Sequence, residues 1–322
     1  MSSVRRPAEW ELHRAVWTAW PEHEDWGQEL ESARAELAAM ARALSESGEQ
    51  VRILVQDDHA QDAPELTEPG IELCPIPYGD IWLRDTGPLF VWEASGRLGA
   101  RCFAWNGWGE RFDYPRDEGL AERIVQDLGL EVIRRNWVLE GGAIDGNGDG
   151  TCLSTRQCLL NDNRGGRSEA EVEIRLREDL GYERVVWLDQ GLLNDHTDGH
   201  VDTVARFVGP DRVICMVPSP GDPNAKQLRD IERALRSSGF EVSTIPSPGE
   251  VRGLDGTLMP ASYVNFFIGN ELVVVPTYGT SFDEAAVRGV ASSFPKRRVI
   301  GLSARALLSG GGAFHCITQE QP

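Results

Sequence analysis

The sequence contains no long hydrophobic run. No segment approaches the roughly 18 consecutive apolar residues that a transmembrane helix requires, so no membrane span is expected. Residues 1–10 are polar and basic and no apolar segment follows them, so the sequence predicts no secretory signal. The two absences together favour a cytoplasmic protein.

Cysteine and histidine are also scarce. Six of each occur among 322 residues, and no two cysteines form a CxxC pair. Scattered cysteines in a chain without a secretory signal indicate reduced thiols rather than a disulfide framework. A metal centre needs clustered ligands, so this scatter predicts neither a resident metal nor another cofactor.

Basic side chains are outnumbered by acidic ones. The chain has 32 Lys and Arg against 51 Asp and Glu, which gives a formal net charge of −19. Nucleic acid is not an expected partner, because phosphate binding needs a basic surface. An acidic field would instead steer a small cationic substrate towards the protein, although it serves solubility equally well.

What the sequence does contain is an internal repeat. Apolar residues recur at intervals of three and four in five segments, which predict helices over 28–47, 118–128, 169–180, 225–237 and 282–294. Capping boxes are predicted at Ser168/Glu171 and Ser281/Glu284. A short β-like run follows each helix, at 51–55, 131–133, 185–188, 242–245 and 299–302. Further β-like runs precede the helices, so the repeat is strand–strand–helix–strand. Five copies would fill one α/β domain over residues 1–322.

A doubly wound nucleotide-binding sheet is the rival architecture, because it also alternates strands and helices. It requires a G-x-G-x-x-G turn between a strand and a helix. The nearest run, 145–150, lies between two β-like runs and is predicted to be a hairpin turn. The same run resembles the start of a calcium loop, but Arg156 occupies the position that needs Glu, so no calcium site is predicted.

A glycine-rich segment, 310–312, leads into a short β-like run that contains Cys316. A single cysteine in such a position is more often a buried apolar residue than a nucleophile. Its neighbour His315 would point to the opposite face of a strand. A base for Cys316 must then come from another segment.

The segment 196–202 offers that base. If residues 199–205 form a strand, His200 and Asp202 share one face and His196 lies outside it. That face could present an imidazole and a carboxylate to one ligand. His196 and His200 could instead bind a metal, and the His-Val-Asp pattern also occurs in hydrolases with two manganese ions.

Two further carboxylates have unusual surroundings. Asp85 lies within a strand-like, aromatic run at 80–88, and Glu140 ends an apolar strand before a pair of glycines. Either could equally form an ion pair or cap a helix.

Four short motifs follow one another along the chain: W-x-R-D-x-G-P at 82–88, E-G-G at 140–142, D-G-H-V-D at 198–202 and G-G-G-x-x-H-C-x-T-Q at 310–319. In this order they resemble the agmatine deiminases and the related Porphyromonas-type peptidylarginine deiminases, as do segments 7–11, 17–21 and 260–266. The resemblance covers the chain from about residue 6 to its end. It implies the pentein fold, an α/β-propeller of five ββαβ units around a pseudo-fivefold axis, which agrees with the repeat found above.

Carried over residue by residue, the resemblance implies Cys316 as nucleophile and His200 as general acid and base. It also implies Asp85, Glu140 and Asp202 as ligands of the guanidinium, with Glu140 part of the catalytic set. A small guanidine, agmatine first, would give N-carbamoylputrescine and ammonia through a covalent thiouronium. Such a reaction needs no metal and no cofactor, and it would belong to arginine and polyamine metabolism.

The pocket for the substrate's distal ammonium is less defined. Trp82, Trp105 and Trp108 could supply cation–π faces. Relatives are often longer and carry histidine in place of Asp145, so the rim of the pocket could differ. Free or peptidyl arginine therefore stay alternatives, as do a manganese ureohydrolase that releases urea and a non-catalytic pentein that binds a cation. The sequence leaves the oligomeric state open, a homo-oligomer included.

Overall fold

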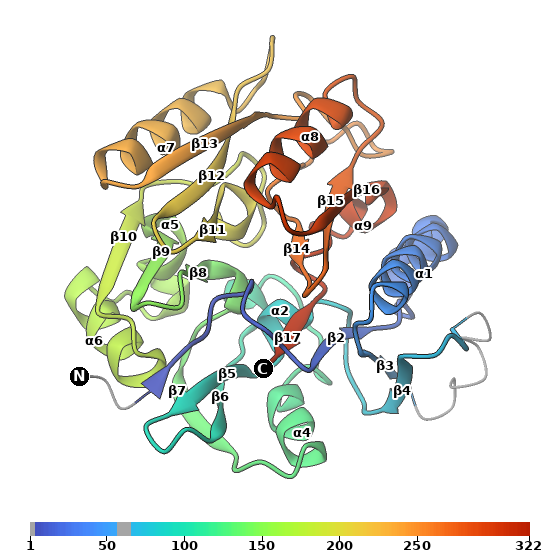
Figure 1. The fold of residues 1–322 in the computed structure, drawn as a ribbon, viewed down its shortest axis with the longest axis vertical. Helices are drawn as coiled ribbons and strands as arrows, with labels where there is room; N and C mark the ends of the chain where they lie inside the picture. Colours follow the sequence, from blue (N-terminus) through green and yellow to red (C-terminus); the bar gives the residue numbers. More distant parts are fainter. Residues whose placement is uncertain (1–3, 57–65) are drawn as a thin grey trace.

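A computed structural model describes residues 4–56 and 66–322 (Figure 1). Within these residues the strands form five small sheets of three or four strands each, set around a common centre with the longer helices at the periphery. Residues 1–3 and 57–65 of the predicted domain lie outside this description. In the described ranges, no helix is both long and apolar enough to cross a bilayer.

Each sheet repeats one connectivity. In one unit, β8 (Ile144–Gly146) pairs antiparallel with β9 (Thr151–Thr155), α6 (Glu169–Leu180) crosses over, and β10 (Arg184–Leu188) pairs parallel with β9. Three more units follow the same order. One consists of β5 (Leu89–Glu93), β6 (Leu98–Ala104), α4 (Leu120–Asp127) and β7 (Ile133–Val138), and the next of β11 (Ala205–Gly209), β12 (Arg212–Val217), α7 (Ala225–Ser237) and β13 (Glu241–Pro246). The third consists of β14 (Phe267–Ile268), β15 (Leu272–Thr277), α8 (Asp283–Ser293) and β16 (Arg298–Ser303). The predicted ββαβ repeat is confirmed.

The remaining unit is assembled from both ends of the chain. β17 (Gln319–Gln321) pairs antiparallel with β2 (Ala15–Ala19), and β3 (Val51–Val55) pairs parallel with β2 after α1 (Leu30–Glu46). β4 (Ile71–Pro75) extends this sheet, while β1 (Val4–Arg5) joins the neighbouring unit through β5. The circle is therefore closed by pairing the last residues with the first. This closure brings the segment before β17 to the centre of the molecule, where Figure 1 places the C-terminus.

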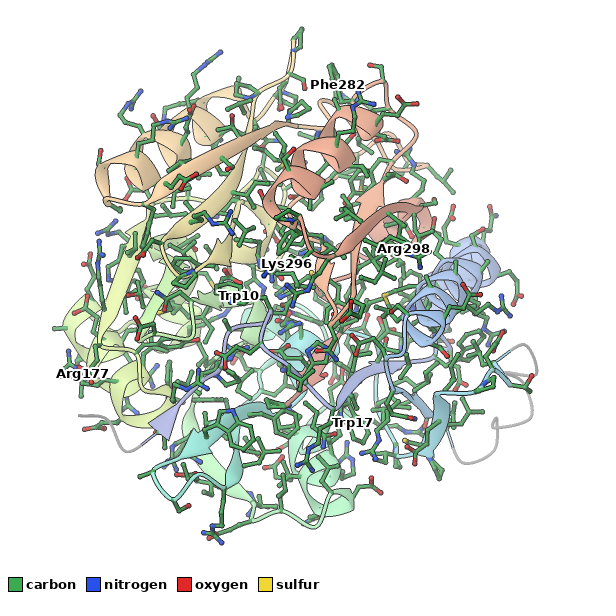
Figure 2. The ribbon with its side chains drawn as sticks, viewed as in Figure 1. Trp10, Trp17, Arg177, Phe282, Lys296 and Arg298 are labelled. Carbon is green, nitrogen blue, oxygen red and sulfur yellow. The ribbon has the colours of Figure 1, made fainter. Side chains whose placement is uncertain are left out.

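The helices face inwards with the stripes that the sequence predicts. In α1, Leu37, Met40 and Leu44 are fully buried against the strands, and full burial of such a side chain stabilises the fold by about 1.5–3 kcal/mol. Side chains fill the space between the sheets, with Trp17 of β2 wholly enclosed (Figure 2). Core packing of this kind fixes the unit-to-unit geometry on which the centre depends.

Short helical turns occupy the connections that face the centre. They are η1 (Glu24–Glu29), α2 (Leu83–Thr86), α3 (Gly107–Glu110), η2 (Gly141–Ala143), α5 (Arg156–Leu159), η3 (Asp162–Arg164), η4 (Val201–Thr203) and α9 (Arg305–Ser309).

The predicted element boundaries hold in part. Helices α6 and α7 begin and end where the periodicity placed them, and the Ser168/Glu171 capping box is present. The strand expected at 131–133 begins only at Ile133. The run at 145–150 forms the predicted hairpin turn, because Oδ1 of Asn147 accepts hydrogen bonds from the amides of Asp149 and Thr151 at 2.9 and 3.0 Å.

The second predicted capping box is wrong. Helix α8 begins after Phe282, which supplies no side-chain cap. Instead, the carboxylate of Asp283 accepts hydrogen bonds from the amides of Gly279 and Thr280 at 2.8 and 3.2 Å. The turn before the helix, rather than its first residues, receives the capping interaction.

This difference can be measured. Replacing Asp283 with Ala should lower the free energy of unfolding by about 1–2 kcal/mol, because the amides of Tyr278, Gly279 and Thr280 and the hydroxyl of Tyr263 lose a charged acceptor. Ser281→Ala is the matched control at the predicted cap, and it should change the free energy by no more than about 0.5 kcal/mol. Urea denaturation followed by circular dichroism compares the two, and a larger loss for Ser281→Ala would contradict the assignment.

Candidate active site

Three predicted side chains converge on one glycine at the centre of the molecule. A Cβ atom at Gly142 would lie 2.6 Å from Nδ1 of His200, 3.0 Å from Oδ2 of Asp202 and 3.0 Å from Oδ1 of Asp85. Only glycine fits at this position. His200 and Asp202 come from the connection before β11 and Asp85 from the connection before β5, so the fold brings Asp85 to the other two.

The local structures differ from the predicted ones. Residues 199–205 are not a strand: η4 (Val201–Thr203) carries Asp202, and His200 precedes it. Asp198 and Gly199 have φ angles of 64° and 86°, which turn the chain sharply before η4. His200 and Asp202 still meet, because the tight turn folds both side chains towards Gly142. The run at 80–88 is likewise not a strand, and Asp85 lies in the short helix α2.

Cys316 lies beside the same centre. Its Sγ is 3.6 Å from Oδ2 of Asp202, and the side-chain amide of Asn265 donates a hydrogen bond to it at 3.1 Å. The expected β-like run is absent here, since residues 313–317 form turns and β17 begins only at Gln319. Sequence reasoning missed Asn265, although it lies in the segment 260–266 that carries part of the resemblance.

The thiol of Cys316 is held in its neutral form. Burial is the main cause, and the carboxylates of Asp202 and Asp85 add to it, so the pKa of Cys316 lies well above its ordinary value. A thiolate forms here once positive charge offsets these carboxylates.

His200 carries a proton in this arrangement. Burial of its ring disfavours the charged form, but the carboxylate of Asp85 and the neighbouring Cys158 and Glu140 outweigh burial. The pKa of His200 therefore lies well above its ordinary value. Nδ1 of His200 is 3.7 Å from Oδ2 of Asp85. The imidazolium is thus available as an acid at the centre.

The carboxylates of Asp85 and Asp202 differ in their environment. Asp85 accepts hydrogen bonds from the Gly142 amide at 2.9 Å and from Nε1 of Trp108 at 2.8 Å. Burial raises the pKa of Asp85, with His200 opposing it and Asp202 and Glu140 adding to it. Burial acts in the same direction on Asp202, but His315 and His200 outweigh it, so the pKa of Asp202 is lowered.

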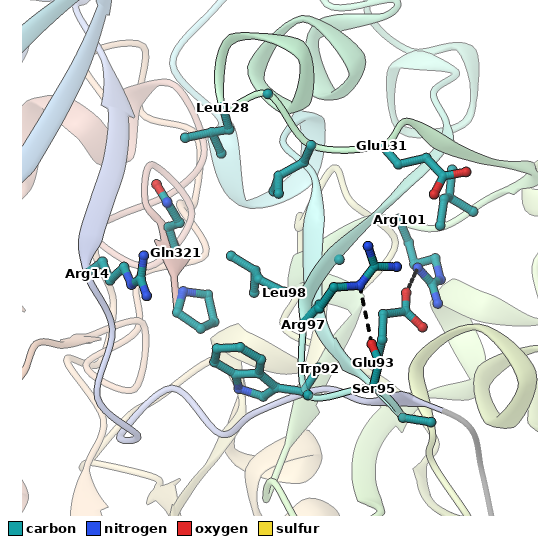
Figure 3. A pocket seen from close by; sticks show the side chains of 17 residues that line it. Arg14, Trp92, Glu93, Ser95, Arg97, Leu98, Arg101, Leu128, Glu131 and Gln321 are labelled. Carbon is teal, nitrogen blue, oxygen red and sulfur yellow. Dashed lines mark hydrogen bonds and ion pairs between the residues drawn. The ribbon is translucent and has the colours of Figure 1, made fainter.

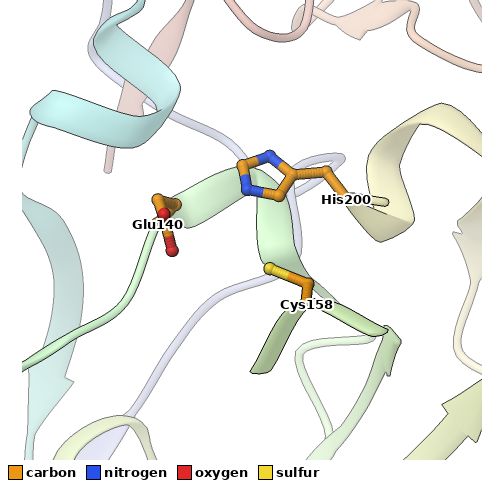
Figure 4. Close-up of side chains that lie close together, drawn as sticks. All are labelled: Glu140, Cys158 and His200. Atoms are coloured by element: carbon orange, nitrogen blue, oxygen red, sulfur yellow. The ribbon is translucent and has the colours of Figure 1, made fainter. Parts of the chain in front are cut away.

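Glu140 is fully buried and belongs to a compact cluster with Cys158 and His200 (Figure 4), whose ligand-type atoms all lie within 4.8 Å of one another. Oε1 of Glu140 accepts a hydrogen bond from Nε of Arg164 at 2.9 Å, while Oε2 has no partner in the described part of the chain. His196 does not belong to this cluster, so the alternative of paired histidine metal ligands loses one of its two residues.

A pocket leads from the surface to Cys316 and Asp85. Its wall is largely aromatic, and it is lined by Trp82, Asp85, Trp108, Phe112, Tyr114, His196, Thr197, Gly310, Gly311, Gly312 and Cys316. Trp82 and Trp108 therefore lie where the sequence predicted an aromatic wall. Trp105 does not line the pocket but packs edge-on against Trp108, with ring centroids 4.5 Å apart. His196, which the sequence placed outside the face of His200 and Asp202, lines this pocket.

The glycines before Cys316 make room for Trp82. A Cβ at Gly310 or Gly312 would lie 2.7 or 2.6 Å from the Trp82 ring, and one at Gly312 also 2.8 Å from Cβ of Cys316. Nε1 of Trp82 donates to Asp80 at 2.8 Å, which fixes the ring in place. The glycine run is thus a close-packing requirement, which places an aromatic face beside the thiol.

Asp145, where this chain departs from the expected histidine, is not part of the pocket wall. Its Oδ1 is 2.7 Å from Nε of the buried Arg206, and Oδ2 accepts a hydrogen bond from the Phe207 amide at 2.6 Å. The residue stabilises β11 against β8.

A second cavity, of about 830 Å³, is lined by residues such as Arg97 and Arg101. Arg97 donates a hydrogen bond to Ser95, and Arg101 donates one to Glu93 (Figure 3). It contains none of the candidate residues.

Comparison with known proteins agrees with this geometry. The sequence profile of the Porphyromonas-type peptidyl-arginine deiminases matches residues 5–322. The chain belongs to this family. The agmatine deiminase of Pseudomonas fluorescens is 35% identical over 350 residues, covering 98% of this chain and 95% of that protein.

Solved structures extend the likeness to the fold of the family. The agmatine deiminase of Enterococcus faecalis superposes with a TM-score of 0.93 at 29% identity, covering 99% of this chain and 96% of that one. An amidinotransferase from Microseira wollei shares the fold alone, with a TM-score of 0.59 at 14% identity over 99% of this chain and 97% of that one. The predicted pentein fold is confirmed.

The neutral state of Cys316 can be tested by alkylation. An ordinary thiol, with a pKa of about 8.5, reacts with iodoacetamide at a rate that levels off above about pH 9. Because the pKa of Cys316 is raised, its rate should still increase about tenfold per pH unit at that point. Peptide mass mapping measures the rate, with Cys316→Ser giving the background of the other thiols. A rate that levels off at about pH 9 or below would contradict the assignment.

Proposed function

We propose that the chain is a hydrolase that converts agmatine and water to N-carbamoylputrescine and ammonia. The observation that carries this proposal is the convergence of Asp85, Asp202 and His200 on Gly142, beside the sulfur of Cys316. A guanidinium is planar and cationic, and its N–H groups form charge-assisted hydrogen bonds to carboxylates around its edge. A buried group of carboxylates next to a thiol suits that ligand better than a neutral one.

Substrate binding would activate the nucleophile. The guanidinium brings positive charge between Asp85, Asp202 and Glu140, which offsets the carboxylates that keep Cys316 neutral. The S–H proton is released to solvent through the pocket as the guanidinium binds, and the resulting thiolate attacks the central guanidinium carbon and forms a C–S bond. His200 donates its proton to the departing nitrogen, the C–N bond breaks, and ammonia leaves a cationic thiouronium on Cys316.

The second half of the cycle uses the same residues. His200, now neutral, takes a proton from water, and the resulting hydroxide attacks the thiouronium carbon. The C–S bond breaks, the sulfur leaves as thiolate and takes up the proton of the hydroxyl group on that carbon, and the neutral ureido product departs with Cys316 again a thiol. No step requires a metal or a cofactor.

The pocket wall favours agmatine over arginine. Among the described residues that line it there is no Lys or Arg, so an α-carboxylate would enter without a cationic partner. The aromatic rings of Trp82, Trp108, Phe112 and Tyr114 could instead face an ammonium group. The cytoplasmic location, one catalytic domain over 1–322 and any homo-oligomer rest on the sequence and stay predictions.

A panel of guanidines distinguishes the candidate functions. Agmatine should release ammonia and no urea, and its kcat/KM should exceed that of free arginine by about 100-fold or more, because the carboxylate of arginine lacks a partner. A blocked peptidyl arginine belongs in the same panel. Urea release would indicate a ureohydrolase, and no turnover of any compound would indicate a binding protein without catalysis.

The covalent step has its own test. Cys316→Ser should abolish turnover, whereas Cys74→Ser, a buried thiol of β4, should leave kcat within about twofold of the wild type. A quenched wild-type reaction should show the adduct on the peptide containing Cys316, by mass spectrometry. His200→Ala should slow both formation and hydrolysis of the adduct. An active Cys316→Ser variant would exclude the thiol mechanism.

A further inference from the structure

His315 lies between two buried carboxylates. Its Nδ1 is 2.6 Å from Oδ2 of Asp202, and its Nε2 is 2.8 Å from Oε2 of Glu9. All three side chains are almost wholly enclosed, with relative exposures of 2% for His315, 0% for Asp202 and 7% for Glu9. These contacts were not predicted from the sequence, because a strand would have turned His315 away from Cys316.

The two contacts define the protonation of the ring. An ionised carboxylate only accepts hydrogen bonds, so a ring nitrogen that faces one must donate. Burial opposes ionisation of Glu9, but Arg206 outweighs burial ahead of His315, so the pKa of Glu9 is lowered and Nε2 of His315 faces an ionised acceptor. Nδ1 lies 2.6 Å from the carboxylate of Asp202. Each ring nitrogen therefore faces a carboxylate oxygen, which is the geometry of a ring that donates from both nitrogens.

Glu9 is itself fixed from several directions. Its Oε1 accepts a hydrogen bond from the Ile268 amide at 2.7 Å, and its Oε2 is 2.7 Å from an Nη atom of Arg206 and 3.4 Å from one of Arg84. A carboxylate with so many donors cannot turn away from the ring. Glu9 thereby sets the orientation of His315.

Asp202 is the member that faces the thiol and the proposed substrate. The oxygen that accepts from His315 is the one 3.6 Å from Sγ of Cys316, and the other oxygen has no hydrogen-bond partner in the described chain. Asp202 therefore keeps acceptor capacity for an incoming N–H group. Without a cation behind it, this carboxylate would share a buried space with Asp85 and Glu140, and protonation would relieve the repulsion.

We infer that Glu9 and His315 are positioning residues for the deimination: Glu9 holds His315 as an imidazolium, and this cation holds Asp202 ionised and oriented for the guanidinium. The inference rests on the proposed function for its effect on catalysis. In the described chain, the ionisable groups around Glu9, His315 and Asp202 are Arg6, Arg84, Asp85, Glu140, His200, Arg206, Arg297, Glu320 and Cys316.

His315→Gln provides the kinetic test. Glutamine can still donate one hydrogen bond but brings no charge, so Asp202 should accept a proton more readily. The acid limb of the pH profile of kcat/KM for agmatine should move to higher pH by about one unit or more. At pH values below this limb, kcat/KM should then be about tenfold lower than in the wild type. An unmoved acid limb in a folded variant would overturn the inference.

His13→Gln is the matched control. His13 is another buried histidine paired with a carboxylate, with Nε2 3.1 Å from Glu49, and it contacts none of the candidate site residues named here. Its replacement should lower the unfolding temperature while leaving the acid limb in place. A role of His315 in stability alone predicts the same behaviour for both variants.

The protonation state can be read without any activity. In ¹⁵N-histidine-labelled wild-type protein at about pH 7.5, His315 should show both ring nitrogens protonated. The signal is identified by its loss in His315→Gln. If that variant does not fold, Glu9→Gln serves, since Nε2 of His315 then loses its charged acceptor and its ¹⁵N signal should change.

A neutral His315 in the wild-type spectrum would overturn the inference and leave the proposed function standing. If His315 is an imidazolium but the protein turns over no guanidine, the proposed function is overturned instead. The inferred effect of His315 on catalysis, which rests on that function, is then overturned with it.

Discussion

The structure depends on bringing several carboxylates together in the interior. Asp85, Glu140 and Asp202 repel one another there, and burial makes the repulsion strong. Each has a cation nearby: His200 beside Asp85, Arg164 on Glu140 and His315 on Asp202. These cations offset part of the repulsion and leave the centre able to attract a cationic ligand. Burial, together with the charges of Asp202 and Asp85, keeps the thiol of Cys316 neutral.

Closure of the propeller is what assembles those compensating charges. Glu9 comes from the segment before β2, while His315 and Cys316 come from the segment before β17, and the pairing of β17 with β2 holds both segments at the centre. Arg206 of β11 bonds to Glu9 and also to Asp145 of β8. A buried ionic network of this kind is sensitive to the loss of a single member, because the partner left behind is a buried, uncompensated charge.

Glycine has a packing role in the same region. At Gly142 the absence of a Cβ lets three functional side chains meet, and at Gly310 and Gly312 it lets the Trp82 ring lie beside the thiol. Both motifs look like flexible segments in the sequence. In the folded protein they are close approaches between backbone and side chain, which no other residue type would permit.

The repeat and most residues of the candidate site could be predicted from the sequence, because short segments carry both. Local periodicity fixed α6 and α7, because burial of one helical stripe is encoded within a dozen residues. Motif order singled out Cys316, His200, Asp85, Glu140 and Asp202, and the fold brings four of them to one point beside Glu140. Tertiary structure alone decided the rest. Asn265 and His315 reach the thiol and Asp202 only through contacts between segments distant in sequence. His196 lies in the pocket wall, whereas Trp105 does not. The chain turns with positive φ angles at Trp108 and Asp198, so the side chains nearby do not alternate as they would in a strand. Side-chain direction in such turns follows from packing and not from residue spacing.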